Sequence, residues 1–221
     1  MNIFYTYIII ICCLIIIKIK KINIVFRTLN TFFHEISHGI VASILKSDVK
    51  NINLNNNASG HCASVSKNHI ANFFIFLAGY TSCAFIPYVL FFAVNKNFTF
   101  FTICIIIIIS ILALAFWIKN KFGRIWTFVF IALNIAFLFV PYLIIFQKYL
   151  IVLYAALIAL DNFFSCLTLI KCAWKNSKSA GDASLLQKTT KIPAMFWSLL
   201  FLAISVFFIY KIYIDFIPLC K

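Results

Sequence analysis

Long apolar segments dominate this chain and limit what it can fold into. Hydrophobic residues make up 64% of its 221 residues and charged residues only 11%, whereas soluble domains contain about 25% charged residues. In lipid, backbone polar groups must be paired within the protein, so apolar segments of about 20 residues cross a membrane as helices. About seven segments are candidate spans: roughly 3–17, 24–45, 69–94, 98–118, 123–146, 149–170 and 193–213. The sequence therefore predicts an all-α, polytopic transmembrane helical bundle, organised as one membrane-embedded domain over residues 1–221.

Two connections between these segments are longer than the others. Residues 46–68 are polar and rich in Asn, and we expect a short extended loop there, after the second span. Residues 171–192 are basic, with five lysines, and are also predicted to be a loop. The first apolar segment has no basic residue before it and is followed by lysines, which indicates a retained helix and not a cleaved signal peptide.

The charge of the chain fits a membrane protein. The formal net charge is +14, which in a soluble protein would suggest nucleic acid as a partner. Here the lysines lie in short loops between apolar segments, as in membrane proteins that face anionic lipid leaflets. We therefore expect an integral, multi-pass protein whose partner is the lipid bilayer and not nucleic acid. The lysine and arginine distribution favours a cytoplasmic N-terminus, but it identifies neither the membrane nor the oligomeric state.

The eight cysteines form no recognisable metal or disulfide pattern. No two are spaced as CxxC, and most lie in apolar segments, where cysteine behaves as a small hydrophobic residue. Cys62 differs from the rest because it lies in the polar loop beside His61.

The stretch His34-Glu35-Ile36-Ser37-His38 is an HExxH motif, and Glu35 is the only glutamate in the chain. Residues i and i+4 share one face of a helix, so His34 and His38 can offer two imidazoles to one metal ion. Glu35 would then lie where it can accept a proton from metal-bound water. The alternative is a chance match in an ordinary helix. The apolar surroundings favour function, because ionisable groups are expensive in a membrane.

A catalytic zinc ion usually has three protein ligands, and Asp161 is the strongest candidate for the third. It is the only acid deep in an apolar segment besides Glu35, where an unpartnered carboxylate costs about 2.5–3.5 kcal/mol. The motif centres 12 positions after Ile24, and Asp161 lies 12 positions after Tyr149. Three predicted spans separate the two helices, so we expect them to run in the same direction, with both sites about 18 Å below the same membrane face.

Other polar residues leave alternatives open. Asp182 is the rival third ligand, although a loop position or a helix N-cap is its ordinary interpretation. His61 is either a further ligand or a loop residue facing water. Asn134 and Asn162 lie inside predicted spans, where they can hydrogen-bond between helices, and Asn162 could also orient its neighbour Asp161.

Five short motifs connect the chain to a known class of enzymes, and they occur between about residues 24 and 210. They are Phe33-His34-Glu35-Ile36-Ser37-His38-Gly39, Ser59-Gly60-His61, Ala78-Gly79-Tyr80, Leu160-Asp161-Asn162 and Gly181-Asp182-Ala183. With these motifs the chain resembles intramembrane zinc metalloproteases of the site-2 protease class, in particular the peptidase M50B-like branch. The resemblance implies Zn²⁺ bound by His34 and His38, with Glu35 as the catalytic acid/base. It also implies that Asp161 occupies the position of the family's membrane aspartate ligand, with Asn162 where many members have glycine.

The sequence thus predicts a zinc-dependent intramembrane endopeptidase that hydrolyses transmembrane or membrane-proximal protein substrates. The alternative is a metal-binding transporter or a non-proteolytic membrane scaffold that retains the HExxH motif. A transporter should carry ionisable groups along a pathway, whereas this chain concentrates them at one point. A scaffold would have no use for a base at Glu35.

Overall fold

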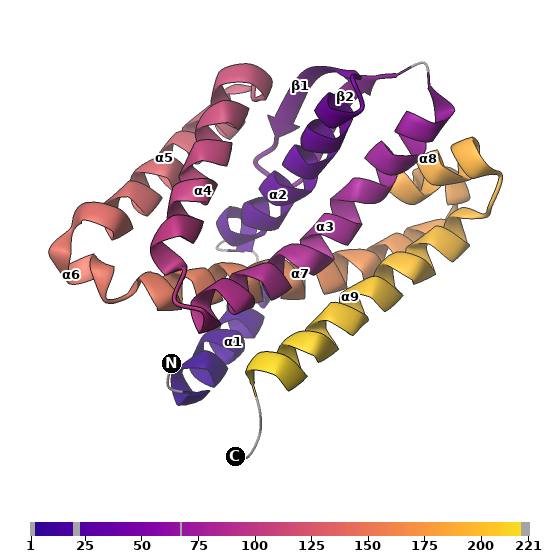
Figure 1. Ribbon diagram of the computed structural model, residues 1–221. Coiled ribbons are helices and arrows are strands. Elements are labelled where there is room, and N and C mark those ends of the chain that lie inside the picture. The colour runs from indigo at the N-terminus through magenta and orange to yellow at the C-terminus, as the bar shows by residue number, and fades with distance from the viewer. Residues whose placement is uncertain (1–2, 20–22, 67, 218–221) are drawn as a thin grey trace.

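The computed structural model describes residues 3–19, 23–66 and 68–217, which form a bundle of helices with one small β-hairpin (Figure 1). The helical elements are α1 (Ile3–Lys18), α2 (Asn23–Ile44), α3 (His69–Asn95), α4 (Thr99–Leu112), η1 (Ala113–Trp117), α5 (Lys121–Phe139), α6 (Pro141–Ile144), α7 (Gln147–Lys175), η2 (Ser177–Ser179), α8 (Gly181–Thr190) and α9 (Ala194–Phe216). Each of the predicted apolar segments contains a helix, which confirms the all-α, polytopic bundle.

The described residues include five helices that are long and apolar enough to cross a membrane, namely α3, α4 with η1, α5, α7 and α9. Helix α1 is apolar but shorter, with its apolar part at Tyr5–Ile16. Helix α2 lies outside this set because it carries polar side chains, among them Arg27, Asn30 and Glu35. The chain is therefore an integral, multi-pass membrane protein.

Helix α7 lies at the centre of the bundle, where it packs against α1, α2, α3 and α9. Its residues Ile151, Val152, Ala155 and Ile158 are completely buried. Helices α4 and α5 pack against each other and form one side of the molecule (Figure 1). Many of their large apolar side chains are exposed, as expected for surfaces that face lipid.

The polar segment after α2 folds into an antiparallel hairpin of β1 (Asp48–Leu54) and β2 (Gly60–Val65). This confirms the predicted extended loop. Ile52 and Leu54 are fully buried, and the backbone N–H of Leu54 donates a hydrogen bond to Asn120 Oδ1 at 3.1 Å. These contacts hold the hairpin against α2 and the start of α5. As a result, Gly60 at the start of β2 lies beside Glu35 of the HExxH motif.

The basic segment 171–192 was predicted to be a loop, and this prediction is wrong. Helix α7 continues to Lys175, the short helix η2 follows, and α8 begins at Gly181. Ala180, Ala183 and Leu186 of this segment are completely buried in a cluster with Trp197 and Phe201 of α9. Apolar contacts therefore hold the first turn of α8 against the bundle, and this turn contains Asp182.

Candidate metal centre

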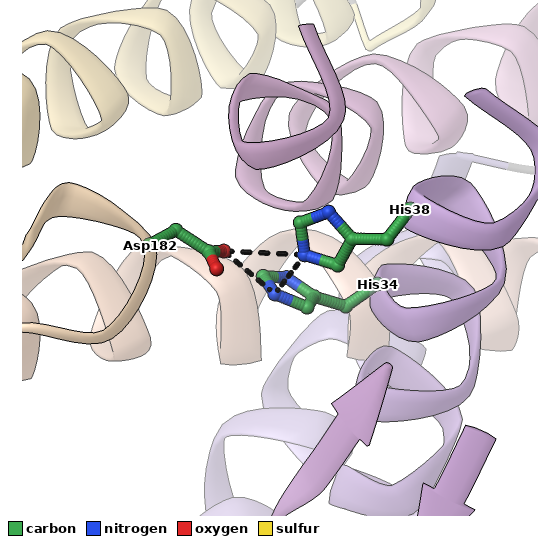
Figure 2. A group of neighbouring side chains, drawn as sticks. All are labelled: His34, His38 and Asp182. Atoms are coloured by element: carbon green, nitrogen blue, oxygen red, sulfur yellow. Dashed lines mark hydrogen bonds and ion pairs between the residues drawn. The ribbon is translucent and has the colours of Figure 1, made fainter. Parts of the chain in front are cut away.

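Three side chains from two distant parts of the chain meet at one point (Figure 2). His34 and His38 project from α2, and Asp182 reaches them from the first turn of α8. The two Nε2 atoms are 3.1 Å apart, and Asp182 Oδ2 lies 3.1 Å from His34 Nε2 and 3.2 Å from His38 Nε2. Within residues 3–19, 23–66 and 68–217, this is the group of His, Cys, Asp or Glu side chains with metal-ligand spacing.

The spacing of these three atoms fits a small divalent cation. In a tetrahedral zinc site with bonds of about 2.0–2.1 Å, neighbouring ligand atoms are about 3.3 Å apart, close to the 3.1–3.2 Å observed. Asp182 Oδ2 is buried, and apart from the two histidine nitrogens it has no possible hydrogen-bond donor among the described residues. A buried carboxylate oxygen without a donor is costly, and a bound cation would satisfy it. Two imidazoles and one carboxylate are also a common zinc donor set.

The orientation of His38 supports the same interpretation. Its Nδ1 lies 2.6 Å from the backbone carbonyl oxygen of Ile75 in α3. A carbonyl can only accept, so Nδ1 carries the proton and Nε2 of a neutral ring presents its lone pair to the cluster. Metal-binding histidines are usually oriented by such a bond from their other ring nitrogen.

Gly79 of α3 allows the cluster to form. A Cβ atom at this position would lie 2.5 Å from the Nε2 atoms of both His34 and His38, well inside van der Waals contact. Tyr80, the next residue, packs its ring against that of His34 with the centroids 4.7 Å apart. The Ala78-Gly79-Tyr80 motif therefore forms the part of the site wall that packs against the two histidine rings.

Glu35 lies beside the cluster and is only 6% exposed. Gly60 at the start of β2 packs directly on it, because a Cβ atom there would lie 2.5 Å from Glu35 Oε1. Glu35, the two histidines and Asp182 all line one cavity of about 520 Å³. This cavity therefore brings the Glu35 carboxylate next to the three candidate metal ligands, and it is large enough for a peptide segment.

The structure corrects the expected position of Asp161. Asp161 lies away from the two histidines and forms an ion pair with Arg27, whose Nε is 2.7 Å from Asp161 Oδ1. Its Oδ2 accepts a hydrogen bond from Asn30 Nδ2 at 3.0 Å. The buried carboxylate does have a partner, as its cost requires, but that partner is an arginine of α2. Asp182, the rival candidate, occupies the position beside the histidines.

Asp182 stays ionised despite its burial. Burial alone would raise its pKa, but the adjacent His38 and His34 outweigh this effect and hold the pKa well below its usual range. In the metal-free protein, a proton on either histidine occupies the same place between nitrogen and carboxylate that a cation would take. Protons and metal therefore compete for one position.

The other polar candidates take lesser positions. His61 lines the cavity but lies outside the group with metal-ligand spacing. Burial, with smaller effects from Glu35 and Asp182, raises the pKa of the Cys62 thiol to about 12, so it is protonated at neutral pH. Asn134 donates to the Phe130 carbonyl oxygen at 2.8 Å within its own helix. Asn162 is fully buried and lies 3.4 Å from Ser205 Oγ of α9, which fits a role in helix packing.

The family of the chain follows from comparison with family models. The model of the Peptidase M50B-like family matches residues 7–212, which is nearly the whole chain. The chain belongs to this family, and its membrane helices and its His-His-Asp cluster place it among the membrane metallopeptidases. Neither the curated proteins nor the solved structures give a match.

Proposed function

We propose that the protein is a zinc-dependent intramembrane endopeptidase, with zinc held by His34, His38 and Asp182. The observation that carries this proposal is the triangle of three donor atoms at 3.1–3.2 Å beside a buried Glu35. Family membership supports peptidase chemistry, and the donor set favours zinc over harder cations, which prefer oxygen ligands.

Zinc, when bound, supplies Lewis acidity that activates water near neutral pH and polarises a substrate carbonyl. Glu35 then acts as the general base, accepting the proton of the attacking water. As the peptide bond breaks, Glu35 returns this proton to the leaving amine. Its position one residue after His34, inside the same cavity, fits both steps.

The cavity also meets the needs of a peptide substrate. A helical substrate hides its carbonyls in internal hydrogen bonds, so the segment that is cleaved must be extended. The cavity is lined partly by polar groups, including Thr31, Ser59, Ser64 and Ser165, which can hold water and peptide groups. We therefore propose transmembrane or membrane-proximal protein segments, presented from the lipid bilayer, as the substrates.

The proposal is tested with Glu35→Gln in protein reconstituted into liposomes with a panel of single-span model substrates. The amide keeps the shape of the side chain but cannot accept a proton, so the variant should bind about one zinc per chain and lose cleavage. Asp48→Asn, which makes the same kind of change on an exposed strand residue, should cleave like the wild type. Cleavage by Glu35→Gln at the wild-type rate would contradict the mechanism. Zinc binding by a wild-type protein that cleaves no substrate of the panel would favour the transporter or scaffold alternative.

A further inference from the structure

Arg27 lies in the same cavity as the candidate metal centre but has no role in the proposed chemistry. It precedes His34 by seven residues on α2, so the two side chains share one face of the helix. With a rise of 1.5 Å per residue, Arg27 lies about 10 Å along the helix axis from His34, the nearer of the two histidines. The cavity therefore has a cationic group at a fixed distance from its reactive end.

The guanidinium is held in a way that leaves most of its donors free. Arg27 Nε donates a hydrogen bond to Asp161 Oδ1 at 2.7 Å. The other carboxylate oxygen, Asp161 Oδ2, accepts a hydrogen bond from Asn30 Nδ2 at 3.0 Å. Among the described residues, neither Nη group of Arg27 has a hydrogen-bond partner. The Arg27 side chain is 39% exposed and that of Asp161 only 5%. Asp161 is therefore the buried member of the pair, and Arg27 is the member that is accessible from the cavity.

The charges around the cavity favour an anionic ligand. Three cations, Arg27, Lys178 and Lys188, line it together with the three acids Glu35, Asp161 and Asp182. With neutral histidines these charges cancel, and a bound divalent cation leaves the cavity with a net positive charge. A planar guanidinium fork with two free Nη groups matches a carboxylate through two parallel hydrogen bonds.

We propose that Arg27 is a specificity residue that binds a carboxylate of the substrate, with Asp161 as the positioning residue that anchors it. This inference rests on the proposed function. An extended peptide advances about 3.3 Å per residue, so the distance of about 10 Å corresponds to a carboxylate about three residues from the scissile bond. The carboxylate can come from an acidic side chain or from the C-terminus of the substrate. The competing explanation is that Arg27 only neutralises Asp161.

The experiment measures binding and not cleavage. Fluorescein-labelled peptide hydroxamates made of Leu and Ala are titrated against the zinc-loaded, full-length protein in detergent, followed by fluorescence anisotropy. The hydroxamate anchors each peptide at the metal, and it is placed at either end so that the peptide extends to either side. The third residue is Glu or Gln, with the C-terminus blocked. A further pair ends at the third residue, with a free or an amidated C-terminus.

In one of the two directions, the peptide with a carboxylate should bind about tenfold or more tightly than its amide partner, as expected for a charge-assisted hydrogen bond. A preference for Glu over Gln identifies a side-chain carboxylate, and a preference for the free C-terminus identifies a terminal one. The double variant Arg27→Gln/Asp161→Asn removes both charges together, so no unpaired charge is buried, and it should lose the preference. Arg124→Gln, on the exposed surface of α5, should keep it.

Each other result contradicts a specific claim. Equal binding of the acid and amide peptides to the wild type, or a preference that survives in the double variant, would overturn the role of Arg27 while leaving the metal centre intact. If no peptide hydroxamate binds in a manner that a chelator reverses, the proposed function fails, and this inference fails with it.

Discussion

Replacing Asp182 by Asn should weaken zinc binding sharply. Asp182 supplies one of three donor atoms and the only negative charge among them. Structural zinc sites with four ligands bind with about 10–16 kcal/mol, or about 3 kcal/mol per ligand. Losing one ligand should therefore lower the affinity about 100-fold or more. The effect arises at the metal, because the amide preserves the size of the side chain in the packed first turn of α8.

Zinc affinity is measured in detergent by competition with a chromophoric chelator, and zinc content by mass spectrometry. Asp161→Asn and Asp48→Asn are the matched controls, since each removes one acid from outside the cluster. Both should bind zinc within a few-fold of the wild type. If Asp161→Asn loses zinc and Asp182→Asn retains it, the assignment of the third ligand to Asp182 is refuted.

Three further predictions follow from the geometry. Zinc affinity should fall as the pH is lowered, because protons compete with zinc for the ring nitrogens of the motif. The two histidines hold the pKa of Asp182 below its usual range, so Asp182 stays ionised, and Asp182→Asn should lower the affinity even at high pH, as zinc titration at several pH values would measure. Gly79→Ala should reduce both zinc content and melting temperature, because its Cβ would lie 2.5 Å from both Nε2 atoms; Gly39→Ala, whose Cβ would meet side-chain carbons at 3.2–3.3 Å, should do so much less. Arg27→Ala should destabilise the fold by about 1–3 kcal/mol, as it leaves Asp161 buried without its cation, and thermal unfolding should show a smaller loss for Arg27→Gln/Asp161→Asn.

Much of the fold could be predicted from the sequence because lipid imposes a simple rule. Each long apolar segment must be a helix, and the observed helices lie where the segments were expected. The histidine pair could also be predicted, since the spacing of His34 and His38 brings two side chains together on any helix. Both conclusions depend on local periodicity and need no knowledge of how the helices pack.

The third member of the cluster depends on packing and could not be predicted in the same way. Equal depth requires helices that run parallel, but α7 is inclined to α2 (Figure 1), so counting residues from the start of each helix misplaced Asp161. The segment before Asp182 is basic and gives no sign in its hydropathy that α8 packs back against the bundle. One signal was present: Arg27 and Asn30 are polar residues one turn apart in an apolar segment, and they are the partners that Asp161 requires.

The most direct test of the proposed metal centre is a crystal structure of the zinc-loaded protein with anomalous diffraction measured at the zinc edge. The proposal predicts one strong peak per chain, within about 2.0–2.2 Å of His34 Nε2, His38 Nε2 and a carboxylate oxygen of Asp182, with the Arg27–Asp161 ion pair intact. A peak beside Asp161, or no peak between the two histidines, would contradict it.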